Sequence, residues 1–298
     1  MNWLVLVVLY ALVGNVLGPI LIKTAATGLG RVERFALQYF FAAALMLAVL
    51  FATGFTLSRS LLFAVCIGFA NGFGTYCQWR AVDLSLSKTA LFSWGSGLIA
   101  VVLGYVLLNE RTVVTPVMAS GLLLVFLSVV LLAIREHRAH KKNAVETGGA
   151  SVYLWITGYS LIWGVVEFLT RVFAVNGVGT ATFLGGWYFG SFLVGLVLLV
   201  GVWGRSGRVP LSFSVRGTLL SAALALMIVA NLGLGYWVYH YLPLAVAQPL
   251  FLILGAVAPA LVGLFYFKEG KRFDRQEWLL YGLGAVGAIL VVIGFVSV

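Results

Sequence analysis

Charged side chains are scarce in this chain of 298 residues. Only 9% of the residues are Asp, Glu, Lys or Arg, whereas soluble domains carry about 25%. Hydrophobic residues make up 62% of the chain, and its mean hydropathy is +1.08. This shortage of charge excludes an ordinary soluble domain and predicts a membrane protein. The apolar runs lack the period-2 alternation of a membrane barrel, so we expect an all-α polytopic protein.

Cysteine and histidine are also rare, and their placement excludes several kinds of site. The two cysteines, Cys66 and Cys77, fall in one expected helix about 16 Å apart, too far for a disulfide. The three histidines, His137, His140 and His240, form no cluster with acidic residues or cysteines at membrane depth. We therefore expect no metal, no cofactor and no membrane-embedded enzyme. The net charge of +10 lies in the connections between apolar runs, so it does not indicate a nucleic-acid partner.

Long apolar runs, separated by charged or glycine-containing breaks, predict ten transmembrane helices. We place them near residues 2–23, 34–53, 60–80, 89–108, 113–134, 152–174, 180–203, 216–241, 246–267 and 276–297. The first residues lack the basic segment of a cleaved signal peptide, so we expect the first helix to be retained. One connection, REHRAHKKNAVETGGAS at 135–151, is long, polar and basic. It indicates a linker between two five-helix halves, 1–134 and 152–298.

The two halves share matched positions that indicate an internal repeat. At an offset of 149, Tyr10 matches Tyr159 and Tyr39 matches Tyr188. At an offset of 160, ANGFGTYCQWRA at 70–81 matches ANLGLGYWVYHY at 230–241. Because each half holds an odd number of helices, the second half enters the membrane inverted relative to the first, as in many secondary transporters.

Lysine and arginine predict which side of the membrane each connection faces. Of the 19 basic residues, 16 fall in connections that follow odd-numbered helices. Basic connections face the cytoplasm, so we expect the linker 135–151 inside and both ends of the chain outside. The pattern is typical of a multi-pass protein of the bacterial inner membrane.

The ends of the two halves also share a motif. GYVLLNERTVVTPVMASGLLLVFLSVVLL carries Gly104 and Glu110, and GLFYFKEGKRFDRQEWLLYGLGAVGAILVVIG carries Gly263 and Glu269. With these residues the chain resembles the drug/metabolite transporter superfamily, in its ten-helix EamA-type branch, and most of all the bacterial aromatic amino acid exporters. The resemblance implies two inverted five-helix repeats around a central cavity and export by alternating access.

Polar side chains inside the expected helices predict the substrate site. Asn71, Thr75 and Gln78 recur at i, i+4 and i+7 and therefore share one helix face. Polar groups in membranes usually face the bundle interior or a water-filled cavity, although they can equally join neighbouring helices. The aromatic candidates beside them can stack on a flat substrate or an organic cation. The candidate substrate-binding residues are Asn15, Asn71, Tyr76, Gln78, Trp79, Trp94, Trp163, Asn231, Tyr239 and Gln248.

Glu167 is the one carboxylate clearly inside an expected span, and Arg171 follows it by four residues. That order and spacing favour a pair within one helix, so we expect mutual neutralisation. A gate or proton-coupling site is the alternative. Glu110 and Glu269, at matched helix ends, are further candidates for gating.

Together these features predict a secondary transporter that exports small organic metabolites, amino acids including aromatic ones first. The alternatives are a multidrug, organic-cation or sugar-derivative transporter of the same fold, and, less favoured, a channel. The expected partners are a small-molecule substrate and membrane lipid, and a monomer is sufficient.

Overall fold

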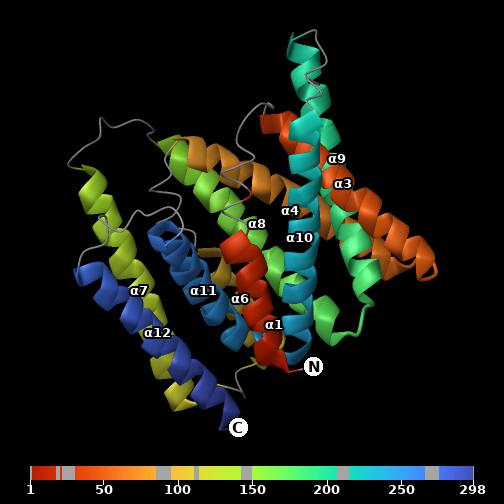
Figure 1. The fold of residues 1–298 in the computed structure, drawn as a ribbon. Helices are drawn as coiled ribbons and strands as arrows, with labels where there is room; N and C mark the ends of the chain where they lie inside the picture. Colours follow the sequence, from red (N-terminus) through yellow and green to blue (C-terminus); the bar gives the residue numbers. More distant parts are fainter. Residues whose placement is uncertain are drawn as a thin grey trace. The chain divides into compact units, whose positions relative to one another are not determined.

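The computed structural model describes residues 2–17, 21, 31–84, 95–110, 114–141, 150–206, 215–265 and 275–297. These residues form helices and their connections, and no strand occurs among them. In Figure 1 the helices are α1 (Trp3–Tyr10), the π-helical η1 (Ala11–Leu17), α3 (Arg31–Ala52), α4 (Arg59–Leu84), α6 (Gly95–Leu107), α7 (Pro116–Lys141), α8 (Ala150–Val175), α9 (Thr180–Ser206), α10 (Val215–Tyr241), α11 (Leu244–Phe265) and α12 (Arg275–Val296).

Six of these helices are long and apolar enough to cross a membrane. They are Val32–Ala52, Arg59–Ala81, Leu154–Val175, Thr180–Gly204, Val215–Tyr241 and Trp278–Val296. Shorter apolar helices cover Trp3–Gly14, Gly95–Leu107, Pro116–Ser128 and Leu244–Gly255. The chain is therefore an α-helical membrane protein with several spans. Each predicted helix has a helical counterpart, and ten complete spans stay a prediction.

The helix ends follow local chemistry. Pro116 occupies the first position of α7, where its missing N–H costs no hydrogen bond. α8 ends at Val175, and Gly177 follows it with φ 69°, a conformation that glycine adopts without strain. The N–H of Val178 then donates to the carbonyl of Phe173 at 3.2 Å and closes this turn. α7 continues to Lys141, so the linker predicted from residue 135 begins later.

The described chain forms two compact units, and each takes helices from both halves of the sequence. Unit 1 comprises Met1–Phe73 and Phe173–Trp237, and unit 2 comprises Gly74–Val172 and Val238–Val298. The predicted halves, 1–134 and 152–298, are sequence repeats and do not coincide with these compact units. The repeat organisation stays a prediction.

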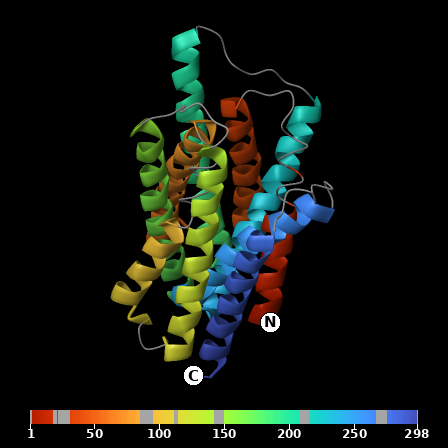
Figure 2. The ribbon, with the colours of Figure 1, turned by 90° about the vertical axis from the view of Figure 1, so that its left-hand side faces the viewer.

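In unit 2, α7 and α12 lie side by side in opposite directions (Figure 2). A Cβ atom on Gly121 would lie 2.6 Å from the Gly287 carbonyl oxygen and 2.8 Å from the Val291 nitrogen. A Cβ atom on Gly287 would lie 2.8 Å from the Gly121 carbonyl oxygen and 2.8 Å from the Val125 nitrogen. The contacts are reciprocal, because Val125 and Val291 each follow their glycine by four residues. The two glycines let the backbones approach closely, as small residues do between membrane helices.

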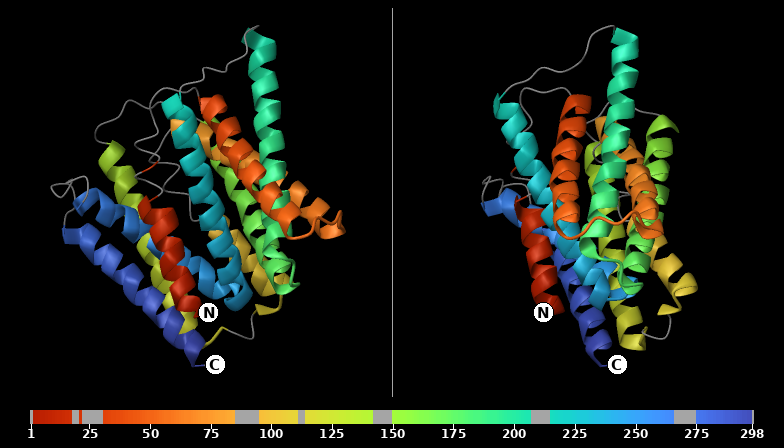
Figure 3. Two further views of the ribbon diagram at one scale, coloured as in Figure 1. Left: turned by 45° about the vertical axis from the view of Figure 1, so that its right-hand side comes forward. Right: turned by 90° about the vertical axis from the view of Figure 1, so that its right-hand side faces the viewer.

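In unit 1, α3 and α9 form a second reciprocal pair (Figure 3). Gly195 faces Ala36, with 3.0 Å between an added Cβ and the Ala36 Cα, and Gly185 faces Met46 and Leu50. Adding 149 to 36 and 46 gives 185 and 195, which is the offset that matches Tyr39 with Tyr188. The rings of these two tyrosines are also neighbours, with centroids 6.3 Å apart.

Candidate functional site

Glu110 lies at the end of α6 and holds the start of α11. α6 ends at Leu107, and Asn109 turns the chain with φ 54°, a left-handed conformation that asparagine tolerates better than most residues. The Glu110 carboxylate then accepts a hydrogen bond through Oε2 from the N–H of Leu244, 2.8 Å away. Leu244 is the first residue of α11, whose leading N–H groups lack partners within the helix. A negative charge is stabilised at that end by the helix dipole.

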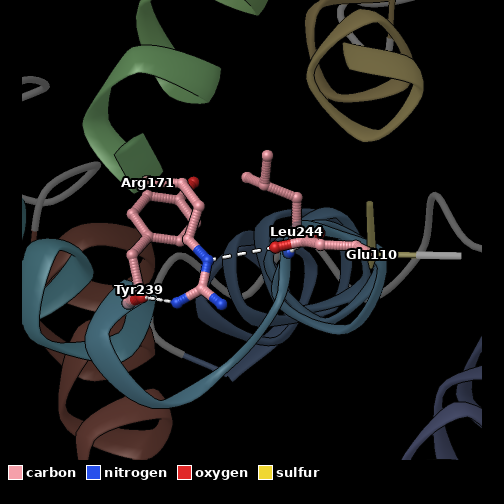
Figure 4. A network of polar contacts seen from close by, with 4 residues as sticks. All are labelled: Glu110, Arg171, Tyr239 and Leu244. Atoms are coloured by element: carbon pink, nitrogen blue, oxygen red, sulfur yellow. Dashed lines mark hydrogen bonds and ion pairs between the residues drawn. The ribbon is translucent and has the colours of Figure 1, made fainter. Parts of the chain in front are cut away.

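Arg171 on α8 binds the same carboxylate and the end of the preceding helix. Its Nε lies 3.1 Å from Glu110 Oε1, and its Nη1 donates to the carbonyl oxygen of Tyr239 in the last turn of α10 (Figure 4). The positive charge therefore lies where the α10 dipole is negative. Only 12% of the Arg171 side chain and 6% of the Glu110 side chain are exposed. We call the ion pair Glu110–Arg171, with its bonds to Leu244 and Tyr239, the clip.

Gln248 on α11 extends this network within unit 2. Its Nε2 donates to Tyr239 Oη at 2.8 Å and to Glu167 Oε2 at 3.2 Å. The side chains of Tyr239 and Gln248 are buried, with 6% and 4% exposed. Every member lies in unit 2, so five of the predicted site residues come together in one place: Glu110, Glu167, Arg171, Tyr239 and Gln248.

The predicted pair between Glu167 and Arg171 was wrong. The partner of Arg171 is Glu110, 61 residues away in sequence, and Glu167 accepts from Gln248 instead. The i, i+4 spacing permits a contact along one helix. The pair within α8 does not form here, because Glu110 and the Tyr239 carbonyl bind the Arg171 guanidinium from other parts of the chain.

Two further polar groups on α8 are buried without a hydrogen-bond partner among the described residues. They are Ser160 Oγ and Trp163 Nε1. Together with Glu167 they lie at i, i+3 and i+7, which places them on one face of the helix. Gly74 of α4 lies against the indole, since a Cβ there would be 2.7 Å from Nε1. A buried donor without an acceptor costs roughly 1–3 kcal/mol, so this face is suited to a ligand that supplies the missing partners.

No family model and no curated protein sequence matches this chain. Among solved structures, a chain described only as "Crystal structure of protein" is similar to it, with a TM-score of 0.67 and 17% sequence identity. The match covers 98% of this chain and 96% of the other. At that identity the likeness concerns the fold alone.

The predicted asparagines lie in unit 1. Asn71 Nδ2 donates to Ser191 Oγ at 3.2 Å, and Ser191 Oγ donates to the Gly68 carbonyl at 2.8 Å, so Asn71 joins α4 to α9. Asn231 lies against Gly14 of η1, and its buried Oδ1 has no partner among the described residues. Asn15 lies in the same π-helical turn. Within unit 1, Asn71 and Asn231 contribute to helix packing. A role of the three asparagines in binding substrate stays a prediction.

The remaining predicted residues lie on the second half of α4 or outside the described residues. The Tyr76 ring meets Trp155 edge to face, with centroids 6.1 Å apart, and Arg80 lies 5.9 Å over the same indole. Gln78 and Trp79 are partly buried. Trp94 and Glu269 lie outside the described residues. The sequence did not single out Ser160 or the Leu244 N–H, because a lone serine is common in such helices and a backbone amide leaves no trace in composition.

Proposed function

We propose that this protein is a secondary transporter that exports small organic metabolites by alternating access. Amino acids, including aromatic ones, are the first substrate class to test. The observation that carries the proposal is the reciprocal packing of matched helices, supported by the buried polar network of unit 2.

The reciprocal contacts are what two inverted repeats would produce. Equivalent helices of an inverted repeat run in opposite directions. Where two such helices meet, the contacts are reciprocal: if residue i of the first helix contacts the equivalent of residue j on the second, then residue j contacts the equivalent of residue i. Gly121 with Val291 and Gly287 with Val125 obey this rule in unit 2. Ala36 with Gly195 and Met46 with Gly185 obey it in unit 1. Repeats of this kind support alternating access in secondary transporters, because the two arrangements of one repeat against the other have similar energies.

The clip is suited to act as the outer gate. Glu110 and the turn between α10 and α11 belong to connections that follow even-numbered helices in the predicted topology, and Arg171 lies one turn before the end of α8, which precedes another such connection. Charge patterning therefore predicts the outer side for all three. The ion pair joins three elements: the end of α6, α8, and the α10–α11 turn. In this proposal a formed clip closes the outer side and an open clip releases substrate.

The α8 face is suited to bind the substrate. Trp163 Nε1 offers a donor that needs an acceptor, as a carboxylate or carbonyl oxygen would supply. Ser160 offers a hydroxyl one turn away, and Glu167 can accept from an ammonium group. An amino acid carries both kinds of group, which is why we place it before sugar derivatives and simple organic cations.

The test is counterflow of radiolabelled amino acids in proteoliposomes, with Trp163→Phe as the perturbation and Trp237→Phe as the matched control. Trp237 Nε1 already donates to Thr180 Oγ1 at 2.9 Å, so this control loses a satisfied hydrogen bond. We expect Trp163→Phe to raise the half-saturating substrate concentration by about 10-fold or more, as loss of a hydrogen bond to a charged group does. The control should leave it unchanged.

The outcomes separate the parts of the proposal. Absence of counterflow for amino acids, organic cations and sugar derivatives alike would refute the transporter assignment. Normal counterflow with an unchanged half-saturating concentration in Trp163→Phe would refute the α8 site and leave transport standing. Steady single-protein conductance without counterflow would instead indicate a channel.

A further inference from the structure

A groove on the outer surface of unit 2 has no role in the function proposed above. It has a volume of 350 Å³ and lies between α6, α7 and α11. Its rim includes Leu98, Leu123 and Phe126, whose side chains are 45%, 65% and 41% exposed. Exposed apolar side chains on membrane helices face lipid, so the groove is entered from the hydrocarbon region rather than from water.

One polar side chain lies in this apolar groove. Among the described lining residues, Gln248 is the only one with a polar side-chain atom, and 4% of its surface is exposed. Its Nε2 is committed to Tyr239 Oη and Glu167 Oε2. Its Oε1 points toward the lining residue Gly97, since a Cβ there would lie 3.1 Å from it. Within the described part of the chain no donor reaches Oε1.

In this structure Nε2 of the amide faces Tyr239 Oη and Glu167 Oε2, and Oε1 faces the groove. This orientation suits an ionised Glu167, which accepts from Nε2 and has no hydrogen to donate. The groove therefore presents an acceptor with free lone pairs, surrounded by apolar walls. An acyl chain has no donor and would leave this acceptor unsatisfied, whereas a molecule with one O–H or N–H would satisfy it.

We infer that this groove is a binding site for a small, neutral, largely apolar molecule with one hydrogen-bond donor, of the phenol, alcohol or indole class, which enters from the lipid. The volume lies at the lower end of the range of small-molecule pockets, about 300–1,000 Å³. The donor of the ligand bonds Gln248 Oε1, and its apolar body contacts the side chains of α6, α7 and α11. The inference does not rest on the transport proposal, although Gln248 also bonds Glu167 of the proposed substrate face.

The inference is tested by equilibrium binding of 2-naphthol and 2-methoxynaphthalene to the protein in lipid nanodiscs, with empty nanodiscs as the blank. The two probes have the same aromatic body, and only the first has a donor. We expect saturable binding of both, with 2-naphthol binding roughly 2- to 10-fold more tightly, the usual effect of one hydrogen bond. Equal affinities, or no binding above the blank, would overturn the inference and leave the groove to acyl chains.

A matched pair of variants on α7 locates the site. Leu123 lines the groove, whereas Leu127, one turn further along and 42% exposed, does not. Leu123→Trp fills the mouth of the groove and should lower the affinity for 2-naphthol at least 10-fold, and Leu127→Trp should leave it unchanged. Equal effects of the two variants would refute this location. If Leu123→Trp fails to fold, the comparison of the two probes on the unmodified protein still decides the inference.

Discussion

Removal of one charge from the clip should destabilise the protein far more than removal of an exposed charge. Glu110 and Arg171 are largely withdrawn from solvent, with 6% and 12% exposed. Breaking such a pair leaves an uncompensated charge and costs about 3–5 kcal/mol. We expect Arg171→Met to lie in that range, because it also removes the donor to the Tyr239 carbonyl. Glu110→Gln should cost less, about 2–3 kcal/mol, because the amide oxygen can still accept from the Leu244 N–H.

The double variant gives the sharper measurement. If the two charges act on each other, Glu110→Gln with Arg171→Met should cost less than the sum of the single changes, with a coupling energy of about 2 kcal/mol. The assay is reversible unfolding in mixed detergent micelles, followed by tryptophan fluorescence. Arg80→Met is the matched control, since Arg80 is exposed and lies 5.9 Å over the Trp155 ring. It should cost about 1 kcal/mol or less.

Two results would contradict this reasoning. One is a Glu110→Gln protein whose free energy of unfolding lies within 0.5 kcal/mol of the wild type, which would mean that the charge of the buried carboxylate does not stabilise the protein. The other is strict additivity of the two single changes, which would mean that the ion pair makes no contribution of its own.

Three further predictions concern topology and packing. Cysteines introduced at Ala144 and Val298 should react with an impermeant thiol reagent on intact cells only at 298, and labelling at 144 alone would reverse the predicted sidedness. Gly121→Leu should destabilise the protein by at least about 1–3 kcal/mol in an unfolding titration, because the side chain would collide with the α12 backbone. Gly201→Leu, where no atom lies within 4 Å of an added Cβ, should stay within 0.5 kcal/mol of the wild type, and a similar loss in both would refute the close-packing argument. Asn71→Ala should cost at least about 0.5–1.5 kcal/mol, since it removes the bond to Ser191, which keeps its own acceptor, and unchanged counterflow would favour packing over substrate binding.

The helices were predictable because the membrane imposes them. A segment in lipid must satisfy its backbone internally and must be apolar over a fixed length, so runs such as 180–203 and 216–241 predict their helices almost to the residue. The match of Tyr39 with Tyr188 predicted an equivalence and not a contact, and the structure adds that α3 and α9 are neighbours, with these two rings 6.3 Å apart.

The register of the last helices was not predictable in the same way. Sequence matching suggested an offset near 160 for the second part of each half, but the reciprocal contacts relate Gly121 to Gly287, an offset of 166. Gly282, Gly284 and Gly287 are spaced closely enough that composition cannot choose among them. The backbone contact between α7 and α12 identifies Gly287 as the counterpart of Gly121, because only a glycine permits so close an approach of the two helices.

The site was predictable in its members and not in its bonds. The sequence singled out four polar residues in apolar surroundings: Glu110, Arg171, Tyr239 and Gln248. A polar group inside a membrane costs free energy, and this cost can be recognised from sequence alone. Which group meets which depends on the tertiary arrangement. Two partners in the clip are backbone atoms, the Leu244 N–H and the Tyr239 carbonyl, and any side chain at those positions would supply them.

The clip also constrains how this sequence can change over generations. Arg171 and Glu110 each bond a backbone group as well as each other, so losing either residue exposes one charge and one helix end at once. An uncharged pair cannot be reached by one substitution. The single variant that must come first keeps one unpaired charge, so it is less stable than both the charged pair and the uncharged pair. Lineages that have replaced the pair should have replaced both residues, whereas Leu244, which contributes only its backbone N–H to the clip, is free to vary within the limits of packing.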